Sequence, residues 1–136
     1  LRAGLGMVNG ILALVPSAKV GHIGLYRDED THEPHEYYCK LPDPIEERTI
    51  VVTDPMLATG SSMELSYQAM LTKGHPAEIH VASIIASRQA VEHIAETLPE
   101  DKTTIWCAAI DPEINEHSYI VPGLGDAGDL AFGEKE

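Results

Sequence analysis

A carboxylate at the end of an apolar strand, followed by small and hydroxyl residues, forms the segment best suited to chemistry. The apolar run is Thr49–Thr53, and after it come Asp54, Pro55, Met56, Leu57, Ala58, Thr59, Gly60, Ser61 and Ser62. If a helix begins at Ser61, the backbone N–H groups of residues 58–62 point into one concavity and the helix N-terminus adds partial positive charge. Asp54 can accept hydrogen bonds from a vicinal diol. The pattern predicts a site for a ribose phosphate.

Gly60 is the position where this loop needs glycine. It either lets the backbone approach a phosphate closely or takes a positive φ. The alternative for the whole segment is an ordinary strand–turn–helix connection with a well-capped helix. The segment is not a P-loop, because no Lys follows the glycine, and it lacks the three glycines of a dinucleotide-binding turn.

Residues 54–62 resemble the phosphoribosyl-diphosphate (PRPP) motif of type I phosphoribosyltransferases, in the form used by uracil phosphoribosyltransferases. Residues 1–7, LRAGLGM, are similar to that family's pyrophosphate loop. Residues 115–129, NEHSYIVPGLGDAGD, are similar to its uracil-binding segment. The resemblance covers essentially the whole chain. It implies transfer of a phosphoribosyl group from PRPP to N1 of uracil, giving UMP and pyrophosphate in pyrimidine salvage.

The resemblance also implies roles for single residues. PRPP would be bound by Arg2, by residues 54–62 and by Asp126, and uracil by Ile120, Gly125, Asp126 and Ala127, largely through main-chain groups. Mg²⁺ would be held mainly by the oxygens of PRPP, with no dedicated metal ligands in the chain. GTP activates some relatives, and a homodimer or homotetramer in the cytoplasm is expected.

The chemistry of these two segments is compatible with such roles. Arg2 lies beside a compact Ala-Gly turn, and a guanidinium binds a diphosphate bidentately. Without the family resemblance, Arg2 could as well be a surface arginine near the end of the chain. The Gly-rich C-terminal segment carries few recognition side chains, which suits a flat base bound by backbone groups, whereas by itself it indicates an irregular loop. Ser61 stands where glycine is common in the family, which narrows the approach to the 5′-phosphate.

Strands and helices alternate in the order that positions such a loop. Apolar runs predict buried strands at residues 20–26, 49–53, 79–85 and 104–110. Helices are predicted at residues 7–14, from Ser61 with a capping box to Glu64, and after Ser87. On this last helix Val91, Ile94, Ala95 and Leu98 would share the buried face. We therefore expect an α/β domain over residues 1–136, an open, mostly parallel sheet with helices on both faces.

Residues 27–48 interrupt this alternation. The stretch is acidic and contains three prolines. It is either an extended β-arm or a loop, and we favour the arm. Because the chain opens with Leu1 inside a motif, we also expect it to lack an N-terminal part of the domain.

Composition excludes other classes of function. A net charge of −13 argues against a nucleic-acid or anionic-membrane surface. Nothing in the sequence approaches the length of a membrane-spanning segment. The cysteines and histidines show no metal-ligand spacing, and Trp106 is expected in the core.

Two alternatives to the enzyme remain. One is a non-catalytic homologue that binds PRPP or a nucleotide, including the phosphoribosyltransferase-like domain of a larger kinase-type protein. The other is an unrelated α/β binding domain. The acidic charge disfavours a nucleic-acid-binding regulator in either case.

Overall fold

Parallel strands form the centre of the molecule. The computed structural model describes residues 2–28, 30–31 and 33–134. One sheet has the order β3 (Thr49–Thr53), β5 (Glu78–Ala82), β7 (Thr103–Trp106), with all strands parallel. A second parallel set has the order β4 (Met56–Leu57), β6 (Ile85–Ser87), β8 (Ala109–Asp111). The predicted α/β fold is confirmed.

Each long strand is interrupted and then resumes as a short one. The predicted strands 79–85 and 104–110 are therefore β5 plus β6 and β7 plus β8. At the break between β5 and β6, the Ser83 hydroxyl donates a local hydrogen bond to Ile85 O at 2.9 Å. Backbone bonds still cross the gap, from Ile84 N to Pro55 O at 3.0 Å and from Ala108 N to Ile84 O at 3.0 Å.

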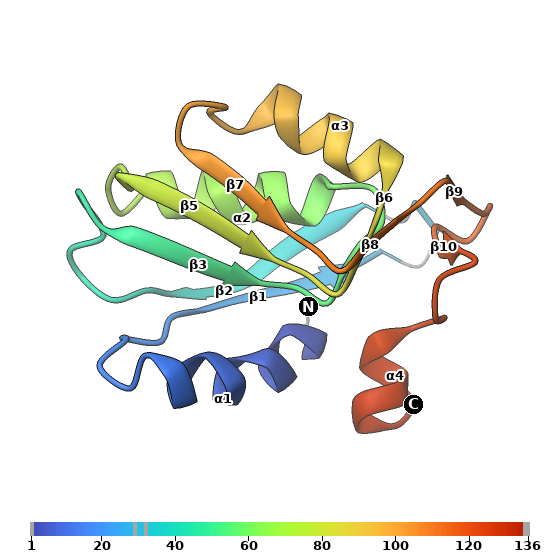
Figure 1. Ribbon diagram of the computed structural model, residues 1–136, viewed down its shortest axis with the longest axis horizontal. Coiled ribbons are helices and arrows are strands. Elements are labelled where there is room, and N and C mark those ends of the chain that lie inside the picture. Colours follow the sequence, from blue (N-terminus) through green and yellow to red (C-terminus); the bar gives the residue numbers. More distant parts are fainter. Residues whose placement is uncertain (1, 29, 32, 135–136) are drawn as a thin grey trace.

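Helices α2 (Ser61–Leu71) and α3 (Arg88–Thr97) cover one face of the sheet, and α1 (Leu5–Leu14) lies on the other side (Figure 1). The starts of α2 and α3 agree with the sequence. The predicted buried face of α3 is partly wrong: Ile94 and Leu98 are buried, but Ala95 is exposed. Ala90 is buried instead, so the face of α3 that packs against the core contains residues 90 and 94, which are four positions apart.

The core lies between the sheet and these two helices. Its buried side chains are Leu57, Met63, Ile79, Val81, Ala86, Ala90, Ile94 and Leu98. They come from strands and helices on both sides of the 54–62 loop, so burial of apolar surface holds the loop's two flanks together.

The other face of the sheet is less covered. Trp106 is 61% exposed, so its predicted place in the core is wrong. Side chains alternate along a strand, and residue 106 falls on the face away from α2 and α3. There its indole N–H donates to Nδ1 of His80 at 3.2 Å. Val51, on the same face of β3, is 46% exposed.

Strands β1 (His22–Arg27) and β2 (Pro34–Lys40) form an antiparallel hairpin apart from the parallel sheets. The strand predicted at residues 20–26 is thus one leg of the arm rather than a member of the main sheet. Leu25 is buried, whereas Tyr26 on the opposite side of the strand is exposed.

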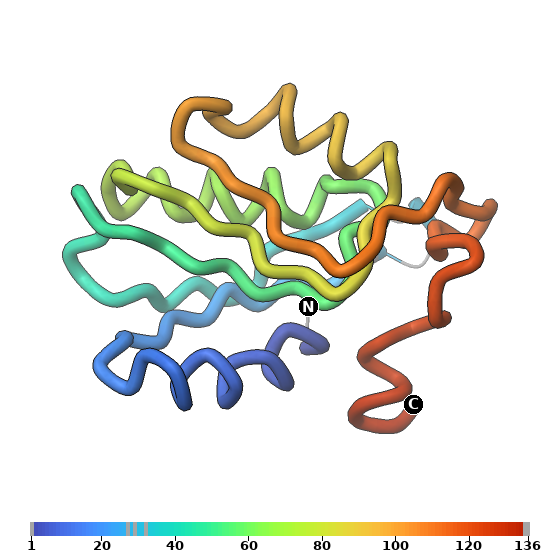
Figure 2. Tube along the Cα trace, viewed as in Figure 1, coloured from blue at the N-terminus to red at the C-terminus, as the bar shows by residue number. Residues whose placement is uncertain are grey.

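The C-terminal part returns to the start of the chain. A short antiparallel pair, β9 (Glu113–Ile114) and β10 (Ile120–Val121), precedes α4 (Ala127–Phe132). This last helix contacts the 3₁₀ turn η1 (Arg2–Gly4), so that the first and last segments lie together (Figure 2). Over the described residues, none of the helices has the length and apolar character needed to cross a bilayer.

Candidate functional site

Asp54 begins the loop directly beyond the C-terminal end of β3. Its N–H donates to Ala82 O at 3.1 Å, which ties it to the neighbouring strand. One of its carboxylate oxygens accepts a 3.2 Å hydrogen bond from Met56 N, and this bond starts the turn. Pro55 and Leu57 are buried and anchor the loop in the protein, so their side chains are not available to a ligand.

Gly60 takes the positive φ that the sequence left open, +85°, and stands at the N-cap of α2. Its carbonyl accepts bonds from Met63 N and Glu64 N. The predicted capping box is wrong, since Ser61 is already the first helical residue and the N-cap position is held by Gly60, which has no side chain. The Thr59 hydroxyl accepts a 3.4 Å hydrogen bond from Ser61 N at this helix end. Glu64 instead pairs with His93 at 2.7 Å.

The hydroxyl groups of the loop are also in place. Thr59 Oγ1 and Ser61 Oγ share a 2.7 Å hydrogen bond. A small pocket of about 20 Å³ opens at the loop, lined by Asp54, Met56, Leu57, Ala58, Gly60, Ser62 and Met63. Helix α2 begins at this pocket, and the partial positive charge of a helix N-terminus favours binding of an anion there.

The turn η1 sits against the end of β3. Thr53 Oγ1 donates to Gly4 O at 3.1 Å, and a Cβ on Gly4 would overlap Thr53 O. Glycine is therefore needed for this close approach. The contact brings the Arg2–Gly4 turn to the residue preceding Asp54, although the two segments are far apart in the sequence.

Arg2 is held by the C-terminal helix. Its Nη2 atom donates to Asp129 Oδ1 at 2.8 Å and to Gly133 O at 2.6 Å. The guanidinium also lies 5.9 Å from the ring centroid of Phe132. Its Nε atom is buried with no hydrogen-bond partner in the described part of the chain. A cation at a helix C-terminus is favourable, so Arg2 stabilises the end of α4.

Asp126 stands at the N-cap of α4 and accepts a 3.0 Å hydrogen bond from Asp129 N. It therefore has a structural role besides the one predicted from the sequence. Both ends of α4 are tied to predicted site residues, Asp126 at the start and Arg2 at the end.

The remaining predicted base-binding residues lie on β10 and the turn after it. Ile120 is 2% exposed, so its side chain belongs to the core and its backbone must make any contact with a base. Gly125, with φ of +80°, faces open space, and Ala127 begins α4. Figure 1 shows β10 at the end of the molecule where β6 and β8 end.

Asp111 contacts the predicted uracil-binding segment, although the sequence did not single it out. Its Oδ2 accepts a 3.0 Å bond from Gly123 N and so holds the turn between Ile120 and Gly125. A signal was present, because Asp111 follows an apolar strand in the same way as Asp54. Ser87, Glu64 and His93 were also not assigned to the site, and they contact the loop or its helix.

Burial raises the pKa of the Cys39 thiol, with a further contribution from the charge of Glu36. This direction is opposite to the one that activates a nucleophile. Cys39 lies on β2, outside the loop, and plays no part in the candidate site.

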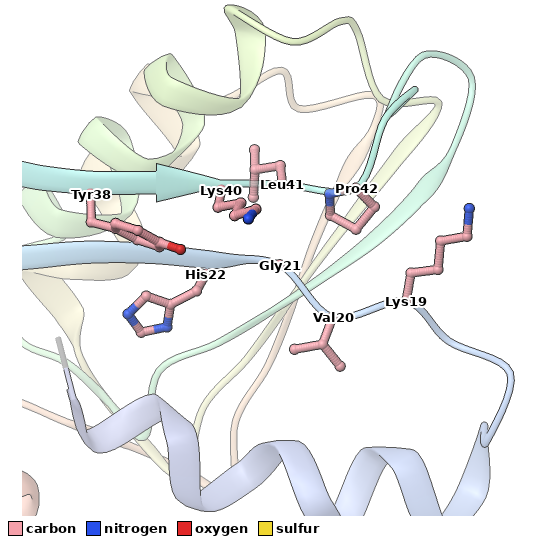
Figure 3. Close-up of a pocket in the computed structure, with 8 residues that line it drawn as sticks. All are labelled: Lys19, Val20, Gly21, His22, Tyr38, Lys40, Leu41 and Pro42. Carbon is pink, nitrogen blue, oxygen red and sulfur yellow. The ribbon is translucent and has the colours of Figure 1, made fainter.

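A wider, open pocket of about 440 Å³ lies at the base of the hairpin (Figure 3). Its lining residues are Lys19, Val20, Gly21, His22, Tyr38, Lys40, Leu41 and Pro42. None of them belongs to the predicted site. Figure 3 shows Lys19 at one end and the rings of His22 and Tyr38 at the other, so the polar groups do not converge on one ligand position.

Comparison with known proteins points to one family. Residues 1–134 match the model of the family described as uracil phosphoribosyltransferase. A uracil phosphoribosyltransferase of Porphyromonas gingivalis is 56% identical over 138 residues, and one of Alkaliphilus metalliredigens is 53% identical over 135 residues. Each alignment covers 99% of this chain and 63% of the relative. The chain thus spans about 63% of the length of these curated relatives.

Solved structures that resemble this one include the following two. A protein of Aquifex aeolicus superimposes with a TM-score of 0.90 at 38% identity, covering 98% of this chain and 62% of the other. A purine phosphoribosyltransferase of Pyrococcus horikoshii gives a TM-score of 0.52 at 17% identity over 84% of this chain and 75% of the other, a likeness of fold alone.

Proposed function

This chain belongs to the uracil phosphoribosyltransferase family, and from that premise we propose that it carries the PRPP- and uracil-binding part of an enzyme that makes UMP and pyrophosphate. The observation that supports this most is the meeting of three distant segments. The η1 turn touches the end of β3 through Gly4 and Thr53, and it touches α4 through Arg2 and Asp129. Diphosphate, ribose and base have to be held side by side in such a reaction.

The 5′-phosphate is assigned to the 54–62 loop. Backbone N–H groups at the start of α2, together with the hydroxyls of Thr59, Ser61 and Ser62, would donate hydrogen bonds to the phosphate oxygens. Support comes from the positive φ of Gly60 and from the pocket at this helix end. Such contacts need no lysine, which agrees with a loop that contains none.

The ribose and the diphosphate are assigned to the charged residues. Asp54 and Asp126 would accept hydrogen bonds from the ribose hydroxyls, and Arg2 would bind the departing diphosphate. The C1′–O bond to diphosphate breaks, the C1′–N1 bond to uracil forms, and the proton of N1 passes to solvent. Positive charge develops on the ribose in between, so nearby carboxylates favour the transition state.

Magnesium is proposed as the metal that accompanies PRPP at this site. Carboxylate oxygens are ligands that Mg²⁺ prefers, and Asp54 and Asp126 stand at the end of β3 and the start of α4. The ion would be held mainly by the oxygens of PRPP. The two carboxylates would accept hydrogen bonds from the water molecules bound to it. When bound, it supplies positive charge to the diphosphate.

Uracil is assigned to the backbone of Ile120, Gly125 and Ala127. The hydrogen bond from Gly123 N to Asp111 fixes the turn between Ile120 and Gly125, so the base would meet a preformed row of backbone groups.

Activation by GTP is proposed as well, and it is tested by adding GTP to the assay. Assembly as a homodimer or homotetramer, consistent with the exposed tyrosines of the hairpin, is tested by light scattering.

The decisive assay uses the full-length protein with PRPP, Mg²⁺ and labelled uracil, and it measures UMP. An Asp126→Asn variant is the sharpest companion, because asparagine also caps helices and so keeps α4 while removing the charge. We expect UMP from the parent and a loss of at least tenfold in kcat/KM from the variant. A parent that binds PRPP without making UMP would instead identify a non-catalytic PRPP-binding homologue.

A further inference from the structure

The N-cap residue of helix α3, Ser87, contacts the 54–62 loop. The hydroxyl of Ser87, which is 0% exposed, donates to Ala58 O at 2.5 Å and accepts from Ala90 N at 2.9 Å. One side chain therefore caps α3 and binds the loop. Without this donor the partly buried carbonyl of Ala58 would lose its partner, which makes the bond costly to remove.

The bond also determines which way a peptide group of the loop points. In a trans peptide the C=O and the following N–H lie on opposite sides. Since the carbonyl of Ala58 is turned toward Ser87 at the N-cap of α3, the N–H of Thr59 is turned away from that helix start. An anion at the N-terminus of α2 needs N–H groups directed outward and carbonyl oxygens directed elsewhere.

A second contact from α3 reaches Gly60. A Cβ built on Gly60 would lie 2.9 Å from His93 Cδ2 and 3.1 Å from His93 Cβ, so the histidine lies against the glycine backbone. Its Nε2 atom pairs with Glu64 at 2.7 Å, and both side chains are half-buried. The histidine is thereby fixed between the loop and the first turn of α2.

Glu64 gives this pair an electrostatic consequence. Its carboxylate is in the first turn of α2, the same helix end that would receive a phosphate, and two anions there repel each other. The bond to His93 directs the carboxylate toward α3. Ser87 and His93 thus act on the loop through different atoms and from one helix.

We propose that Ser87 and His93 are positioning residues, which hold the backbone of Ala58–Gly60 in its anion-binding conformation and thereby set the affinity for the ribose 5-phosphate end of PRPP. The proposal deepens the function proposed for the 54–62 loop and rests on it. Neither residue needs to touch the substrate, because each acts through the loop.

The test compares Ser87→Ala and His93→Ala with the parent, in the full-length protein. Calorimetry with ribose 5-phosphate gives the dissociation constant, and steady-state kinetics give KM for PRPP, KM for uracil and kcat. We expect each variant to raise the ribose 5-phosphate dissociation constant and the PRPP KM about tenfold, the effect of losing one good hydrogen bond. The uracil KM and kcat should stay within about twofold of the parent values.

Matched controls separate positioning from general loss of stability. Ser83→Ala removes another buried hydroxyl bonded to a backbone carbonyl, and His80→Ala removes a half-buried histidine from the opposite face of the sheet. Both should leave ribose 5-phosphate affinity unchanged. Ser87→Thr keeps the hydroxyl and should recover most of the affinity lost in Ser87→Ala.

The outcomes are distinguishable. A parent that binds ribose 5-phosphate, with Ser87→Ala and His93→Ala binding it equally well, overturns the positioning role and leaves the proposed function intact. A parent that binds neither ribose 5-phosphate nor PRPP overturns both. Should His93→Ala unfold, Ser87→Ala decides alone, because it deletes a single oxygen from a helix cap and is the milder change.

Discussion

The guanidinium of Arg2 donates a 2.8 Å hydrogen bond to the carboxylate of Asp129, a residue 127 positions further along the chain. The same guanidinium bonds Gly133 O at 2.6 Å, so it connects the first turn of the protein to both the body and the end of α4. Under the proposed function, this pair decides where the diphosphate-binding cation points.

Asp129→Asn should weaken PRPP binding. The substitution keeps the shape and an acceptor oxygen but removes the charge that holds Arg2. Because both side chains are about one-third exposed, at 35% and 31%, solvent screens the pair and its contribution is at most about 1 kcal/mol. We expect the PRPP KM to rise about two- to fivefold in steady-state assays, with Asp101→Asn as an exposed control. A fall in KM would show instead that Asp129 competes with the diphosphate for Arg2.

Gly4→Ala should destabilise the protein, whereas Gly6→Ala should not. A Cβ on Gly4 overlaps the backbone oxygen of Thr53, and η1 or β3 must shift to accept it. The expected loss in the free energy of unfolding is about 1–3 kcal/mol, as for other overpacked sites. No atom lies within 4 Å of a Cβ on Gly6, which is in α1, so alanine there should gain up to about 1 kcal/mol of helix propensity.

Urea unfolding of the two variants provides the measurement for this pair. Equal stabilities would contradict the close approach of η1 to β3. The two variants are matched, because each adds one methyl group to a glycine near the same end of the chain.

Asp111→Ala should affect uracil more than PRPP. Its carboxylate accepts the bond from Gly123 N that fixes the turn before Gly125. Hydrogen bonds to charged groups contribute about 1.5–3 kcal/mol, and this one is partly buried, so we expect the uracil KM to rise about tenfold. The PRPP KM should change less than threefold, and Asp111→Asn, which keeps an acceptor, should recover part of the loss. Equal effects on both KM values would contradict the assignment of this turn to the base.

Cys39 should react slowly with alkylating reagents in the folded protein. Burial, followed by the negative charge of Glu36, raises the pKa of its thiol, so less thiolate is present at pH 8 than in an unfolded chain. In a Cys107→Ser background, labelling by iodoacetamide should be slower in buffer than in urea, and the difference should shrink as the pH rises above 9. Equal rates at pH 8 would show that the thiol is not perturbed.

Local sequence determined much of the fold and the position of the loop. A β-branched run ending in Asp54, small residues and then a helix is specified by near neighbours, because strand propensity, turn chemistry and helix starts act over a few residues. The same holds for the glycine at position 60, whose φ is +85°, and for Ser87 as the cap of α3. Family resemblance in two further segments then indicated the substrates.

Which faces are covered was decided by the tertiary structure. Side chains alternate along a strand, so the sequence predicts that Trp106 and Ile105 point to opposite faces of the sheet. It does not predict which face packs against α2 and α3. The sequence therefore placed Trp106 in the core, where the structure leaves it exposed. The capping box failed for a similar reason, since Glu64 meets His93, 29 residues away, in preference to the nearby backbone.

The site itself is assembled by contacts between distant residues. Thr53 bonds Gly4 across 49 positions, Ser87 bonds Ala58 across 29, and Arg2 bonds Asp129 across 127. Each motif could be recognised alone because its residues are neighbours in the chain. Their common location depends on how the helices pack over the parallel sheet, which burial of the shared apolar core determines and no single segment encodes.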